Sequence, residues 1–256
     1  MSGAARDSNL PAVDERLVAP ESRHEIWDGR VKYVAPADEP HGRQHSKLLA
    51  LLEAHAASGY AVAADMLTRT SAIDDIAPDA SVYPVARDPQ TGRRKLEELG
   101  FEIASTESLS EAGRKAQKLV GRGVRRVFAI DVERQRAVEW SVETDSWRIL
   151  DQDSLIADRT LAAPLPVCAL LSAAAADDAM ATALLTKQNP VLVAAVRAGE
   201  AKGKLAAVLA VLEARGLSPT ESQLQRLTSE RDAARLDAWL RAAVHCGQIA
   251  ELLDTE

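Results

Sequence analysis

The alternation of apolar and polar residues changes its period along the first part of the chain. Residues 23–34 read RHEIWDGRVKYV, with an alternating run on each side of Asp28 and Gly29. An Asp-Gly pair between two such runs predicts a β-hairpin with a type I′ turn, because glycine adopts a positive φ at little cost. Residues 45–58 instead repeat leucine at helical spacing, which predicts an α-helix.

Short apolar runs bounded by turn-forming residues predict a series of strands after this helix. The predicted strands cover residues 60–70, 79–85, 99–105, 125–131, 135–142 and 146–152. The segment 74–78 is typical of a turn, and a second helix is predicted over residues 109–122. The pattern up to about residue 160 therefore predicts a mixed α/β domain.

The pattern becomes helical after Pro164 and Pro166. Alanine occurs 24 times in the last 96 residues and 23 times in the first 160, so the composition changes at the same place. The predicted helices cover residues 167–186, 190–215, 219–228 and 230–245. We therefore expect a flexible N-terminal arm over residues 1–19, an α/β domain over residues 20–165 and an all-α tail over residues 166–256.

Composition restricts the classes of function. The 256 residues are 46% hydrophobic, which is enough for a globular core, and the net charge of −7 argues against a broad electrostatic grip on nucleic acid. The two cysteines, Cys168 and Cys246, form no cluster typical of zinc sites or disulfide frameworks. No segment has the pattern of a membrane span or a signal peptide, so we expect a cytoplasmic protein without a membrane partner.

Three charged residues in or near predicted strands are candidates for chemistry. Asp79 opens one strand, Glu102 lies inside the apolar run GFEIAS, and Lys115 lies on the following helix. Two carboxylates on neighbouring strands can bind one divalent cation, and a lysine beside them can stabilise negative charge that develops in a reaction. The structural alternative is a Pro-Asp turn, a strand glutamate that faces solvent and a lysine on a solvated helix face.

Five motifs between residues 24 and 131 occur in an order that resembles one known family. They are HEIWDGRVKYV, PHGRQHSKLLALL, PDASVYP, FEIAS and GRKAQKLVGRGVRRVFAID. In this order they resemble the Uma-type endonuclease family of the PD-(D/E)XK restriction-endonuclease-like superfamily. The resemblance implies a restriction-endonuclease-like mixed sheet flanked by helices, and hydrolysis of phosphodiester bonds in DNA.

The resemblance also assigns roles to residues of this chain. Asp79 and Glu102 would be catalytic and would bind Mg²⁺ or Mn²⁺, and Glu25 would be an accessory metal ligand. Ala104 stands where the superfamily usually has its lysine, so the catalytic lysine would be Lys115 on the helix, with Lys118 the weaker candidate.

Other residues favour structural readings. His41 and His45 lie four residues apart, but a capping or surface role is favoured over metal ligation because no acidic helix residue accompanies them. The basic loop at Arg93, Arg94 and Lys95 is typical of a solvated loop, with a phosphate contact as the alternative.

Two functions remain open from the sequence. The first is a Mg²⁺-dependent endodeoxyribonuclease that acts on DNA, with a homodimer formed through the helical tail. The alternative is a catalytically inactive protein with the nuclease fold that acts as an interaction or oligomerisation module.

Overall fold

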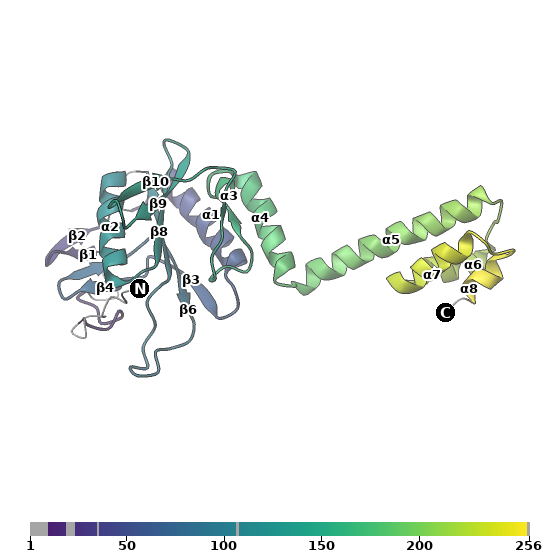
Figure 1. Cartoon of the computed structure of the whole chain (residues 1–256), viewed down its shortest axis with the longest axis horizontal. Coiled ribbons are helices and arrows are strands. Elements are labelled where there is room, and N and C mark those ends of the chain that lie inside the picture. The colour runs from purple at the N-terminus through teal and green to yellow at the C-terminus, as the bar shows by residue number, and fades with distance from the viewer. Residues whose placement is uncertain (1–9, 19–23, 35, 106–107, 255–256) are drawn as a thin grey trace. The chain divides into compact units, whose positions relative to one another are not determined.

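The computed structural model describes residues 10–18, 24–34, 36–105 and 108–254 (Figure 1). The strands are β1 (His24–Trp27), β2 (Arg30–Tyr33), β3 (Tyr60–Ala64), β4 (Thr68–Ser71), β5 (Asp74–Ile76), β6 (Ala80–Pro84), β7 (Leu99–Ala104), β8 (Arg126–Asp131), β9 (Arg136–Ser141), β10 (Ser146–Ile149), β11 (Leu155–Ile156) and β12 (Leu165–Pro166). The helices are α1 (Glu39–His55), α2 (Leu109–Arg122), α3 (Val167–Leu171), α4 (Ala173–Thr186), α5 (Pro190–Ala214), α6 (Glu221–Ser229), α7 (Ala233–Ala243) and α8 (Ile249–Leu253). The fold is therefore α/β with a helical C-terminal region.

A mixed six-stranded sheet forms the centre of the first unit. Its strand order is β10-β9-β8-β7-β6-β3, and β7 and β8 are its parallel pair, connected through α2. The other neighbouring strands are antiparallel. Every residue of β7 is buried, which explains its nearly continuous apolar sequence. Phe101 of β7 stacks on Phe128 of β8 with 5.0 Å between the ring centroids.

Helices cover the two faces of this sheet. Leucines 48, 51 and 52 of α1 pack with Phe101, Ile103 and other residues of the sheet in one apolar core. On the other side, α2 contacts β7 and β8 and also β4 and β5 of a second sheet. Leu119 of α2 shares a smaller core with Trp27 of β1 and Val127 of β8. Helix α2 is therefore packed against both sheets.

The second sheet has the strand order β2-β1-β5-β4. The predicted hairpin is confirmed as β1 and β2, and Asp28 and Gly29 have φ values of 50° and 75°, as a type I′ turn requires. The single strand predicted over residues 60–70 is wrong, because β3 and β4 belong to different sheets. The turn predicted over residues 74–78 is also wrong in part, because Asp74–Ile76 forms β5 and pairs with β1 and β4.

Part of the expected N-terminal arm is bound to this second sheet. Val13 and Val18 are buried, and the amide of Leu17 donates a hydrogen bond to Asp75 Oδ2 over 2.6 Å. The amide of Arg69 donates to the carbonyl of Val13 over 3.0 Å. Residues 10–18 are therefore not a free arm, and the rest of the expected arm, residues 1–9 and 19, lies outside the described residues.

The chain divides into two compact units after Lys187, beyond the boundary expected at residue 165. The predicted helix over residues 167–186 is interrupted at Ser172, whose hydroxyl caps α4, and both α3 and α4 belong to the first unit. In the second unit, Leu212 of α5 packs with Leu227, Leu236 and Trp239, as the leucine pattern predicted. The expectation that Leu224 faces this core is wrong, because its side chain is exposed. Among the described residues, no helix combines the length and apolar character needed to cross a bilayer.

Candidate active site

Asp79 and Glu102 lie opposite each other at neighbouring strands. The register of β6 and β7 pairs Ala80 with Phe101, and Asp79 directly precedes Ala80 while Glu102 directly follows Phe101. Directly opposite residues of antiparallel strands lie on the same face of a sheet. The amide of Ile103 also donates a hydrogen bond to Asp79 Oδ2 over 2.6 Å, which ties the aspartate to the strand that carries Glu102.

Glu102 is directed away from the core under α1. Its neighbours Phe101 and Ile103 belong to that core, so alternation along the strand places Glu102 on the α2 side. Its side chain is only 2% exposed, and Oε2 lies 3.3 Å from Nζ of Lys115 on α2. The alternative of a solvent-facing strand glutamate is therefore wrong.

Lys115 lies between two buried glutamates. Its Nζ is 3.3 Å from Glu102 Oε2 and 3.6 Å from Glu25 Oε1, and it donates a hydrogen bond to the carbonyl of Ala77 over 3.3 Å. The side chain is 6% exposed, so it is not part of a solvated helix face. The structure therefore brings Glu25, Glu102 and Lys115 together from β1, β7 and α2.

Glu25 is held by two further donors. Its Oε2 accepts a hydrogen bond from the indole Nε1 of Trp27 over 2.7 Å, and its Oε1 accepts one from the amide of Ala77 over 2.8 Å. Trp27 lies two residues further along the same strand, so both side chains are on one face of β1. The smaller sheet thus delivers a fixed carboxylate to the lysine.

Asp79 occupies a largely enclosed position beside two cationic groups. Its side chain is 13% exposed, and Oδ1 lies 3.7 Å from His41 Nε2. Burial raises the pKa of the Asp79 carboxyl above its ordinary value, and the charges of Lys115 and His41 oppose that shift only in part. A cation beside this carboxylate would favour its ionised form.

His41 and His45 both contact this site, so their expected capping or surface roles are corrected. Asp38, not His41, caps α1: its side chain accepts a hydrogen bond from the amide of His41. The ring Nδ1 of His41 lies 3.2 Å from Ser105 Oγ, and the ring Nε2 of His45 donates to the carbonyl of Asp79 over 2.6 Å. The first turns of α1 therefore lie beside Asp79.

One group of side chains has donor atoms close enough to hold a metal ion. Among the described residues, the candidate atoms of His45, Asp65 and Asp79 lie within 4.8 Å of one another. Two carboxylates suit Mg²⁺ or Mn²⁺, and an imidazole ligand suits transition metals better than Mg²⁺. The donor set therefore fits a divalent cation of this kind.

Sequence reasoning missed Asp65 because it fell inside the single strand predicted over residues 60–70. The residue directly follows β3 and has a φ of 47°. Aspartate and asparagine adopt this left-handed conformation more readily than most residues, so an acidic residue at that point was a weak signal for a strand end.

The position of Lys115 depends on close packing at the start of α2. Ser108 caps the helix through the amide of Glu111, and Gly123, with a φ of 117°, ends it. Trp147 donates a hydrogen bond from Nε1 to the carbonyl of Leu109 over 2.9 Å, and its ring meets that of Trp140 edge to face. The two tryptophans therefore fix the first turn of α2 on the β9–β10 hairpin.

Lys118, the weaker lysine candidate, lies in a different set of contacts. Its Nζ is 2.7 Å from Asp28 Oδ1 and 2.8 Å from Asp74 Oδ1. These contacts join α2 to the hairpin turn and to β5. The structure therefore gives Lys118 a structural ion pair on the smaller sheet.

The basic loop before β7 is not simply solvated. Arg94 is buried and bonds to Glu97 Oε2 over 3.0 Å, to Thr68 Oγ1 over 2.8 Å and to the carbonyl of Leu67 over 3.0 Å. Arg93 pairs with Asp14 and Glu15. These partners favour a structural role for the loop rather than phosphate binding.

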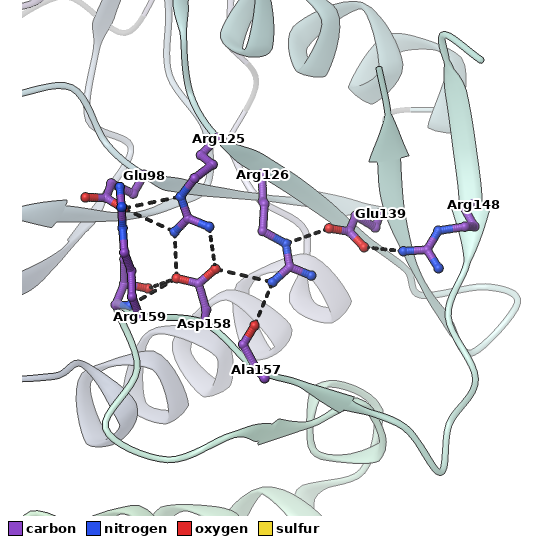
Figure 2. A network of polar contacts seen from close by, with 9 residues as sticks. Glu98, Arg125, Arg126, Glu139, Arg148, Ala157, Asp158 and Arg159 are labelled. Atoms are coloured by element: carbon purple, nitrogen blue, oxygen red, sulfur yellow. Dashed lines mark hydrogen bonds and ion pairs between the residues drawn. The ribbon is translucent and has the colours of Figure 1, made fainter. Parts of the chain in front are cut away.

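Arg125 and Arg126 are also used within the protein (Figure 2). Arg125 pairs with Glu98 and Asp158, and Arg126 pairs with Asp158 and Glu139. The network ties the start of β8 to β9 and to the loop around Asp158. Their charges are therefore largely balanced by carboxylates of the same unit.

Comparisons with known proteins agree with this architecture. A family model named Uma2, with the description "Putative restriction endonuclease", matches residues 11–167. A solved structure from Anabaena variabilis, described as "a putative nuclease belonging to DUF820", is similar at 13% identity and a TM-score of 0.48, over 58% of this chain and 89% of that chain. No curated protein matches the chain. Because the family match covers more than half of its length, the chain belongs to the Uma2 family.

Proposed function

We propose that the chain is an endonuclease that hydrolyses phosphodiester bonds in DNA with the help of Mg²⁺ or Mn²⁺. The observation that carries this proposal is the position of Asp79 opposite Glu102, with Lys115 on Glu102. Family membership supports a nuclease activity, and the two carboxylates supply oxygen ligands for a hard cation. DNA as the substrate and the dependence on metal are parts of the proposal.

Each residue has a distinct role in the proposed reaction. Asp79 and Glu102 would bind the cation, with His45 and Asp65 near enough to contribute on the α1 side. A bound cation would polarise the phosphodiester and lower the pKa of the attacking water. Lys115 would stabilise the negative charge that develops on the phosphate oxygens, because a fixed ammonium in a buried site acts more strongly than one in water.

The contacts of Glu25 bear on its proposed role as an accessory metal ligand. Both of its oxygens already accept hydrogen bonds, one from Trp27 and one from Ala77. Direct ligation would require at least one of these bonds to lengthen or break. The contacts therefore favour a role in holding Lys115 over a role on the metal.

A nicking assay on supercoiled plasmid tests the proposal. We expect cleavage with Mg²⁺ or Mn²⁺, none with a chelator, and none in Asp79→Asn or Glu102→Gln. Asp177→Asn is a matched control, since Asp177 is exposed on α4 and makes no contact that the structure describes. An assay on single-stranded RNA of the same length would distinguish the substrates. Wild-type protein that binds neither cation and cuts neither nucleic acid would refute the proposal.

An interaction module is the second candidate function, and one observation favours it. In α5, Val191 is 73% exposed and Val196 is 48% exposed, although the later part of the helix is packed within its own unit. We propose that this apolar surface supports a homodimer. Light scattering should give twice the mass of one chain for wild type and a monomer for Val191→Ser/Val196→Ser. A wild-type monomer at micromolar concentration would refute the dimer.

A further inference from the structure

Glu25 and Lys115 are joined through one residue of the main chain as well as directly. The amide of Ala77 donates to Glu25 Oε1 over 2.8 Å, while its carbonyl accepts from Lys115 Nζ over 3.3 Å. Ala77 lies two residues before Asp79. The glutamate and the lysine are therefore fixed on the segment that leads into the proposed cation ligand.

Lys115 has a second carboxylate that does not depend on the proposed cation. Glu102 is the nearer partner, at 3.3 Å, and it is also a proposed cation ligand. A cation on Glu102 would draw its charge away from Lys115 and repel the ammonium. A buried ammonium without a counter-charge is costly, so Lys115 would leave its position or lose its proton unless another carboxylate held it.

We propose that Glu25 is a positioning residue that holds the Lys115 ammonium in place when Glu102 is engaged by a cation. The inference rests on the proposed function for its purpose. The contact itself can be tested without any nuclease activity. Glu25 suits the task because its side chain is 2% exposed and Trp27 and Ala77 fix both oxygens.

The test measures how fast an amine-directed reagent modifies Lys115, with peptide mass spectrometry as the readout. Glu102→Gln stands in for the loss of Glu102 charge, so no cation is needed. We expect Lys115 to be protected in wild type, Glu102→Gln and Glu25→Gln, and to react at least ten times faster in the double variant. Release into solvent and loss of the proton would both raise reactivity.

A matched control separates this role from a general loss of stability. Glu97 is equally buried and pairs with Arg94, 3.0 Å away, in the same unit. Glu97→Gln combined with Glu102→Gln should therefore leave Lys115 protected. The inference is overturned if Lys115 stays protected in the Glu25 double variant, or if the Glu97 double variant exposes it as much.

A second readout uses the cation and the reaction. With Mn²⁺ bound, Lys115 should stay protected in wild type and become reactive in Glu25→Gln. In the plasmid assay Glu25→Gln should lower kcat and leave KM and Mn²⁺ affinity nearly unchanged. Trp27→Phe, which removes only the donor to Oε2, should cause a smaller fall. Absence of Mn²⁺ binding in wild type would refute the proposed function, whereas the cation-free modification rates decide the role of Glu25.

Discussion

Gly113 of α2 lies directly against Trp140 of β9. A Cβ atom at position 113 would be 3.0 Å from Cζ3 of Trp140 and 3.3 Å from Nε1 of Trp147. Those distances are shorter than ordinary contacts between carbon atoms, so any larger residue must displace the tryptophans or the helix. The absence of a side chain thus sets how closely the helix that carries Lys115 approaches the sheet.

Gly113→Ala should destabilise the first unit by about 1–3 kcal/mol, the usual cost of an overpacked core. Nuclease activity should fall with it, because Lys115 lies two residues further along α2. Gly121→Ala is the control: it is in the same helix, and nothing lies within 4 Å of its added Cβ. It should raise stability by about 0.4–1 kcal/mol. Urea denaturation measures both, and equal effects would refute the packing argument.

The ion-pair network around Asp158 predicts a loss of stability in acid. Burial raises the pKa of this carboxyl, but hydrogen bonds from Arg125 and Thr160 outweigh burial, so its pKa lies well below the ordinary value. A carboxyl with a lowered pKa stabilises the fold above its ordinary pKa, and this contribution is lost as the pH falls.

Asp158→Asn should therefore lower the free energy of unfolding by about 1.5–3 kcal/mol at pH 7, since it removes hydrogen bonds to a charged group. The difference from wild type should shrink steadily below about pH 4. Asp153→Asn, at an exposed position in the preceding loop, should change little at either pH. Urea denaturation at a series of pH values checks this, and a difference that grows in acid would contradict it.

Lys115→Ala should lower turnover by roughly 10²–10³-fold, as the loss of one fixed donor to a developing charge commonly does. Its affinity for Mn²⁺ should stay near that of wild type, because lysine is not a ligand. The variant should also unfold more easily, since two buried glutamates lose a cationic partner. Lys118→Ala should lose stability through Asp28 and Asp74 but retain its turnover per folded molecule. Equal activity in Lys115→Ala would remove the lysine from the chemistry.

Asp65→Asn tests the group on the α1 side. Asparagine tolerates the left-handed backbone at this position, so the turn after β3 should be preserved. If Asp65 helps to bind the cation, calorimetry should show an affinity for Mn²⁺ weaker by about tenfold or more. Asp177→Asn should show the wild-type affinity. Unchanged Mn²⁺ binding in Asp65→Asn would confine the ligands to Asp79 and Glu102.

Local patterns in the sequence predicted the elements that depend mainly on neighbouring residues. The Asp28-Gly29 hairpin was confirmed because its turn needs two positive φ angles that these residues accept. The helix over residues 109–122 was confirmed in its bounds because Ser108 and Gly123 cap it. A glutamate inside an apolar strand was also a sound signal, since Glu102 is buried beside a lysine.

Features that depend on distant partners could not be predicted in the same way. The segment around Asp75 is a strand because it pairs with β1 and β4, and its composition alone is typical of a turn. The pairing of Glu25 with Lys115 joins residues on different elements and leaves no periodic signal. His41 and Asp65 contribute to the surroundings of Asp79 only because α1 and the end of β3 meet there.

The contact of α2 with both sheets has a consequence for how activity would respond to heating. Glu25 lies on the smaller sheet, Glu102 on the larger one and Lys115 on the helix packed against both. Proteins open locally at a lower free energy than they unfold as a whole. A brief departure of the β1–β2 hairpin would separate Glu25 from the lysine while the six-stranded sheet remained intact. Inactivation would then precede melting, and cleavage would serve as a sensitive thermometer of hairpin docking.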